Sequence, residues 1–146
     1  MAAAYTVEPL SPEGVDQAYP LIQAIEPELD RARWHRLYES LCAEAGPCPA
    51  VLVVTAATRR FYALCCADVL READGRSVLS ISRLMIDSAF DARGIGEVLL
   101  RALADYAARN RCARVRIAVA GTDAAAMRAL SEAQAALGTG LAIQLA

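Results

Sequence analysis

Residues 83–119 read RLMIDSAFDARGIGEVLLRALADYAARNRCARVRIAV, and this stretch decides the fold. Two closely spaced glycines, Gly94 and Gly96, separate a β-rich segment from a long helical pattern. Within that pattern apolar residues recur at spacings of three and four, which is typical of an amphipathic helix. Its buried face is expected to hold Ile95, Val98, Leu99, Ala102, Leu103 and Tyr106. Arginines then alternate with apolar residues over 113–120, which predicts a half-buried strand after the helix.

The rest of the chain carries three further helical patterns. Ser11 precedes Pro12, a pair that favours a helix start, and we expect that helix to be kinked or interrupted at Pro20. Further helices are predicted over residues 28–46 and 122–137.

Short apolar and β-branched runs predict the remaining strands, over residues 5–10, 49–56, 59–70, 76–87 and 138–146. The dipeptide Asp74-Gly75 predicts a hairpin between two of them, because both residues tolerate positive φ. The resulting order is β-α-α-β-β-β-α-β-α-β. This order predicts one α/β (α+β) domain over residues 1–146, with a mixed central sheet of about six or seven strands flanked by helices.

Composition excludes several classes of protein. The net charge of -2 argues against a general nucleic-acid binder, and no apolar run is long enough to span a membrane. The amino terminus lacks the basic segment and apolar run of a secretory signal, so a cytoplasmic location is expected. The five cysteines match no zinc spacing; we therefore expect buried, reduced thiols and no metal.

The glycine turn suits an anion. A helix begins with unpaired backbone N–H groups and a positive partial charge, and glycines let a phosphate approach these donors. The turn lacks the lysine of a P-loop and the third glycine of the dinucleotide fingerprint. The alternative is a tight strand-to-helix connection that binds nothing.

In this context residues 83–119 resemble the Gcn5-related N-acetyltransferase superfamily. In that family a central strand leads into a turn of pattern Arg/Gln-x-x-Gly-x-Gly/Ala, whose backbone amides hold the pyrophosphate of acetyl-coenzyme A (acetyl-CoA). The resemblance implies an N-acyltransferase that takes acetyl-CoA, or another acyl-CoA, as co-substrate and needs no metal. The acceptor would be an amine of a small molecule or peptide, with neither nucleic acid nor membrane as partner.

The resemblance also implies a cofactor-binding set. Its strand part would pair with the pantetheine arm, its turn would bind the pyrophosphate through backbone amides, and the start of the last helix would contribute one more residue. These residues are Leu84, Met85 and Ile86; then Asp91, Ala92, Arg93, Gly94, Ile95 and Gly96; and finally Asp123.

Two positions depart from the family pattern. Asp91 stands where the family has Arg or Gln, and a carboxylate there repels a pyrophosphate, with Arg93 able to neutralise it in part. Leu130 stands where the family often has a tyrosine that protonates the departing thiolate, and Ser131 follows it.

No general acid or base stands out. Weak catalytic candidates are His35, for its pKa range, Glu26 in the acidic stretch between the first two helices, and Ser131. The alternative for His35 is a partly exposed helix residue beside Trp34. The alternative for the acids Glu26, Glu28 and Asp30 is a solvated helix start; if functional, they would attract a cationic amine.

Three hypotheses therefore remain. The first is an active acyl-CoA-dependent N-acyltransferase. The second is a catalytically silent acyl-CoA-binding or interaction module with the same fold. The third is an α/β domain that binds neither, and any of the three could be a homodimer.

Overall fold

The computed structural model describes residues 4–44, 50–87, 91–117, 124–137 and 142–145. The elements are β1 (Thr6–Pro9), a 3₁₀ turn η1 (Pro12–Gly14), α1 (Val15–Ile25), α2 (Arg31–Glu44), β2 (Val51–Thr55), β3 (Phe61–Arg71), β4 (Ser77–Ile86), α3 (Ala92–Arg109), β5 (Cys112–Ile117), α4 (Ala124–Leu137) and β6 (Ala142–Leu145). The predicted order of strands and helices is confirmed.

The described strands form one sheet in the order β1-β2-β3-β4-β5-β6. Neighbours from β1 to β4 are antiparallel, whereas β5 and β6 run parallel to β4. Helix α3 connects β4 to β5, as a parallel pair requires. The predicted mixed α/β fold is therefore confirmed.

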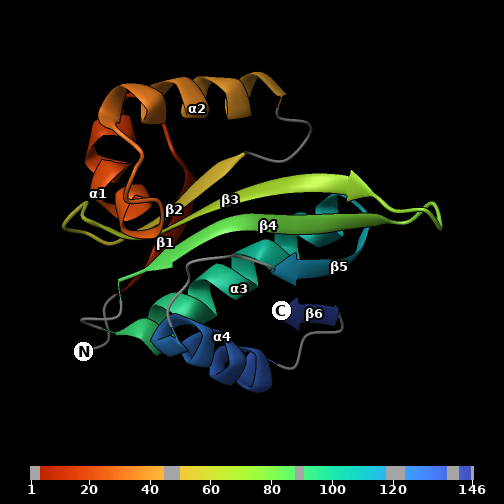
Figure 1. Ribbon diagram of the computed structural model, residues 1–146. Helices are drawn as coiled ribbons and strands as arrows, with labels where there is room; N and C mark the ends of the chain where they lie inside the picture. Colours follow the sequence, from red (N-terminus) through yellow and green to blue (C-terminus); the bar gives the residue numbers. More distant parts are fainter. Residues whose placement is uncertain (1–3, 45–49, 88–90, 118–123, 138–141, 146) are drawn as a thin grey trace.

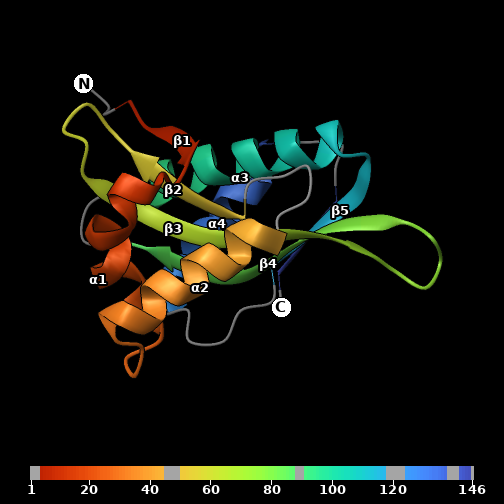
Figure 2. The same cartoon turned by 90° about the horizontal axis from the view of Figure 1, so that it is seen from above.

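Helices cover the sheet on both faces (Figures 1 and 2). Helix α1 packs on β3 and β4 and helix α2 on β2, while α3 lies on the opposite face with α4 beside it. Each face has its own apolar core, because successive strand residues point to opposite sides. Cys65 belongs to the α3 side and Cys66 to the α1–α2 side, as alternation predicts.

The β3–β4 hairpin has a different turn from the one that Asp74-Gly75 suggested. Gly75 has a φ of 85°, but Asp74 is not among the described residues with positive φ. The Gly75 N–H donates to the Glu72 carbonyl at 3.0 Å, and the Glu72 N–H donates to the Arg76 carbonyl at 2.8 Å. This pattern fits a three-residue loop in which only the glycine needs the left-handed region.

The first helix is continuous across Pro20, so of the expected kink or interruption the interruption does not occur. Pro20 lies inside α1 without interrupting it, because Ala18, Leu21 and Ile22 are buried against the core and hold the helix on the sheet. Ser11 precedes the short 3₁₀ turn rather than the α-helix, and its side chain makes no capping hydrogen bond.

The cysteine expectation was wrong at one position. Cys65, Cys66 and Cys112 are buried free thiols, but Cys42, in the last turn of α2, is exposed; Cys48 lies outside the described residues. Over the ranges given above, no group of three or more His, Cys, Asp or Glu side chains could hold a metal ion. None of the described helices is long and apolar enough to cross a membrane.

Candidate active site

Strand β4 carries a bulge at its centre. Arg83 pairs with Cys66 and Ile81 pairs with Ala67 on β3, so Ser82 is the extra residue between them. Ile81 and Leu84 both pack in the α3-side core, and the bulge therefore turns Arg83 toward the face covered by α1 and α2.

The pairing of β4 with its other neighbour, β5, ends near this bulge. The register runs from Ser77 opposite Cys112 to Ile81 opposite Ile117, and among the described residues it does not continue along Arg83–Ile86. The resemblance placed the pantetheine contacts at Leu84, Met85 and Ile86, which is this same part of β4. Leu84 and Ile86 are buried on the α3 side, and Met85 packs partly buried on the α1–α2 side.

Asp91 is the N-cap of α3. Its carboxylate accepts a hydrogen bond from the Gly94 N–H at 3.1 Å, and its carbonyl accepts one from the Ile95 N–H at 3.0 Å. A methyl group on Gly94 would lie only 2.2 Å from a carboxylate oxygen of Asp91. Because Gly94 has no side chain, the Asp91 carboxylate fits beside it. The Gly94 N–H, which we expected to bind a phosphate, therefore already donates to an anion, the Asp91 carboxylate.

Tyr5, near the amino terminus, forms a hydrogen bond with the Asp91 carboxylate that caps α3. Burial raises the pKa of Tyr5, and the charge of Asp91 and a hydrogen bond to its carboxylate raise it further. The Tyr5 ring also meets the edge of Tyr62 with ring centroids 5.5 Å apart. Sequence reasoning missed Tyr5, because no local pattern connects it to a turn far along the chain.

Gly96 serves a different contact from Gly94. It is buried against α4, where a methyl group would meet the Ala129 carbonyl oxygen at 3.5 Å and the Leu130 side chain at 3.8 Å. Leu130 is itself fully buried in the α3-side core, whereas its neighbour Ser131 is exposed. The position at which the family often has a tyrosine therefore contributes packing in this chain.

The other predicted turn residues have separate environments. Arg93 is largely exposed and pairs with Glu97 at 3.3 Å, so its nearest anionic partner is not Asp91. Ile95 is buried, so only its backbone could contact a ligand, and Ala92 is half-buried. Asp123 lies outside the described residues.

The bulge brings Arg83 to Glu26, which follows α1. The Arg83 Nε donates to Glu26 Oε1 at 2.5 Å. The two side chains are 28% and 38% exposed, so the pair is partly desolvated but within reach of solvent. The thiol of Cys66 lies beside Arg83; burial raises its pKa to about 11, and the guanidinium partly offsets that rise.

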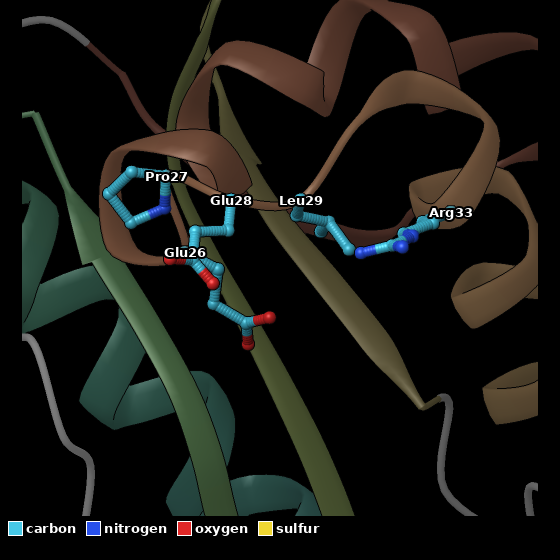
Figure 3. Close-up of a pocket in the computed structure, with 5 residues that line it drawn as sticks. All are labelled: Glu26, Pro27, Glu28, Leu29 and Arg33. Atoms are coloured by element: carbon cyan, nitrogen blue, oxygen red, sulfur yellow. The ribbon is translucent and has the colours of Figure 1, made fainter.

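A pocket of about 520 Å³ opens at Glu26, and its lining comes from the loop between α1 and α2 and the first turn of α2. The lining residues are Glu26, Pro27, Glu28, Leu29 and Arg33. Figure 3 shows the Glu26 and Glu28 side chains extending to the same side of the loop, toward the strands, while Arg33 extends back toward Leu29. The pocket therefore has two carboxylates on its sheet side, with Leu29 between them and Arg33 and with Pro27 on their other side.

The three catalytic candidates have different partners. Glu26 pairs with Arg83, whereas His35 Nε2 lies 2.8 Å from Asp16 Oδ1 on α1. Hydrogen bonds from His35 and then Arg31 hold the pKa of Asp16 below its ordinary value. Ser131 is an exposed residue of α4, the helix beside α3, so of these three candidates only Glu26 lines the pocket.

Several solved structures share this fold. An aminoglycoside N-acetyltransferase solved in complex with CoA has 13% sequence identity and a TM-score of 0.68, over 92% of this chain and 88% of that chain. Glucosamine-6-phosphate N-acetyltransferase from Arabidopsis thaliana has 12% identity and a TM-score of 0.66, over 98% and 97%. An aminoglycoside 6'-N-acetyltransferase from Acinetobacter baumannii has 18% identity and a TM-score of 0.65, over 93% and 90%.

At these identities the structural likeness shows the fold alone, and no curated protein matches the chain. The sequence itself is more specific. It matches the family model described as "Acetyltransferase (GNAT) family" over residues 15–133, which include the α1–α2 pocket, the bulged strand and the glycine turn. The chain belongs to the acetyltransferase (GNAT) family.

Proposed function

We propose that this protein is an N-acyltransferase that moves an acetyl or other short acyl group from CoA to an amine of a small molecule or peptide. The observation that carries the proposal is the arrangement around the bulge of β4. The strand leads to the capped turn of α3 at its end, and the Glu26 pocket opens on its α1–α2 face. A donor held along Arg83–Ile86 and an acceptor held in the pocket would meet at this strand.

The start of α3 fits an anionic group such as pyrophosphate. Its amide turn already binds the Asp91 carboxylate through Gly94, so the turn is built to accept negative charge. A phosphate that uses the Gly94 N–H must displace this carboxylate, while the N–H groups of Ala92 and Arg93 lie in the same first turn. The site therefore suits CoA, with Asp91 as an internal competitor.

Acetyl-CoA, when bound, supplies an activated acyl group, whose transfer forms a C–N bond to the amine and releases the thiol. The chain's own residues bind and orient the partners. The carboxylates of Glu26 and Glu28 would draw a cationic amine into the pocket, and Arg83 holds the Glu26 side chain in place. We expect a backbone N–H between Leu84 and Ile86 to orient the acyl carbonyl.

Two observations favour a second function, a silent acyl-CoA-binding module. The Asp91 carboxylate occupies an amide donor of the α3 turn, and Leu130 puts an aliphatic side chain where the family often has a hydroxyl. Both leave the fold intact while weakening cofactor binding and proton supply to the leaving group.

Titration of acetyl-CoA followed by an assay for thiol release across an amine panel separates these functions. The proposed enzyme binds acetyl-CoA saturably and releases thiol only when an amine is present. Binding without release for any amine would establish the silent module, and the absence of heat at high micromolar acetyl-CoA would reject both.

A further inference from the structure

The Glu26–Arg83 ion pair adjoins the pocket, because Glu26 lines the cavity and Arg83 holds Glu26 from β4. It joins the segment after α1 to β4 directly next to the bulge, and Glu26 also lines the cavity. Arg83 does not line the cavity itself, but its side chain is partly exposed and touches Glu26, so a ligand bound at Glu26 lies next to both charges.

The charges of this pair decide which ligand fits. A simple cationic amine that binds Glu26 competes with Arg83 and leaves the guanidinium without its carboxylate. That guanidinium is partly desolvated and lies beside the buried Cys66 thiol, which cannot replace the lost negative charge because its pKa is about 11. A ligand that brings its own carboxylate restores a partner to Arg83 as its amine binds Glu26.

Resting on the proposed function, we propose that the acceptor is a zwitterion of the α-amino acid class, which inserts into the Glu26–Arg83 pair. Its amine binds Glu26, and its carboxylate binds the planar guanidinium of Arg83, whose several N–H donors match a carboxylate. Pro27 and Leu29, the apolar residues of the pocket lining, then contact the acceptor's side chain. Every charge of the pair keeps a partner in the complex.

The first test is binding in the absence of CoA. Calorimetry compares a panel of α-amino acids with their carboxamides and with the amines that lack the carboxylate. At least one amino acid binds tenfold or more tightly than both of its analogues, and R83Q removes this preference. R36Q, an exposed arginine on α2 away from the pocket lining, is the matched control and keeps it.

A charge swap separates recognition from a purely structural latch. Glu26→Arg combined with Arg83→Glu preserves the ion pair but reverses its direction. The swapped protein still prefers the amino acid over its carboxamide in binding, because both charges remain, but it loses at least tenfold in acylation of that amino acid, because the amine now points away from its original position. A latch without a recognition role would leave the acylation of that amino acid unchanged. Circular dichroism verifies folding, and if the swap does not fold, the wild-type panel decides alone.

The outcomes distinguish this inference from the proposed function. If no amino acid binds more tightly than its carboxamide, while simple amines are acylated, the zwitterion proposal is wrong and the acyltransferase proposal stands. If amino acids bind with the expected preference but no thiol is released from acetyl-CoA, the recognition site stands and the enzymatic proposal is wrong.

Discussion

The carboxylate of Asp91 accepts a hydrogen bond from the backbone N–H of Gly94 at 3.1 Å. A side chain of the protein itself therefore occupies a hydrogen-bond donor in the first turn of α3. The aspartate that seemed to oppose cofactor binding is at the same time the helix cap. This dual role links the stability of α3 to the affinity for acetyl-CoA, so a substitution of Asp91 should change both, in opposite directions.

Replacing Asp91 by Arg, the residue type of the family pattern, should tighten acetyl-CoA binding. Removal of the carboxylate ends a screened repulsion of about 1 kcal/mol, which corresponds to roughly fivefold in affinity, and the new cation adds to it. The loss of the cap should lower the free energy of unfolding by about 1 kcal/mol. Calorimetric titration and urea unfolding measure the two effects. D105N on the exposed side of the same helix is the control, and an unchanged affinity of D91R would contradict the placement of the pyrophosphate.

Gly94→Ala tests the contact between Gly94 and Asp91. A methyl group would lie 2.2 Å from the carboxylate, so the cap must move, and this loss offsets the roughly 1 kcal/mol that Ala gains over Gly in a helix. In a D91A background the cap is already absent, so G94A should become stabilising. Urea unfolding of the four proteins should give a coupling of about 1 kcal/mol.

Gly96→Ala is the control for that cycle. A methyl group there meets only ordinary contacts with α4, at 3.5 Å or more, so G96A should stabilise both backgrounds equally. Equal effects of G94A in the two backgrounds would show that the Asp91 cap does not form.

Leu130→Tyr should not create a general acid. Leu130 is fully buried between α3 and α4, and a larger side chain with a hydroxyl overpacks this core by about 1–3 kcal/mol. We expect a lower free energy of unfolding and no gain in thiol release. A variant that is as stable as the wild type and more active would mean that this position opens to the site.

Tyr38 predicts a stability change at alkaline pH. Burial raises its pKa to about 12, and its hydroxyl donates to the Leu10 carbonyl at 2.6 Å. The unfolded chain ionises first, near pH 10, so the stabilisation is complete below that pH and is lost as the pH rises toward about 12. At neutral pH, Y38F should be less stable by about 1 kcal/mol, and this difference should shrink above pH 10. A difference that does not depend on pH would contradict the assignment.

Local patterns predicted the elements well. The spacing of Ile95, Leu99 and Leu103 placed α3, and the alternation of Arg114 with Val115 placed β5, because each pattern has the period of its own element. The N-cap role of Asp91 also had a local signal, since aspartate immediately before a helix is a favoured cap. The family pattern has Arg or Gln at this position, which points to a ligand contact rather than to a cap.

The proposed acceptor site, formed by Glu26 and Arg83, could not be predicted from local patterns. Glu26 and Arg83 are distant in sequence and meet only because the bulge at Ser82 turns Arg83 to the α1–α2 face. No periodicity marks a single extra residue in a strand of continuous β character. The close packing of Gly96 on Leu130 likewise depends on how α4 returns against α3, which lies beyond any local pattern.

The proposed acyltransferase activity is tested most directly by amine-dependent release of thiol from acetyl-CoA by the purified protein. We predict release that requires both protein and an amine, with one acetyl group added to the amine for each thiol released. Saturable binding of acetyl-CoA with no release above the protein-free rate for any amine in the panel would contradict it.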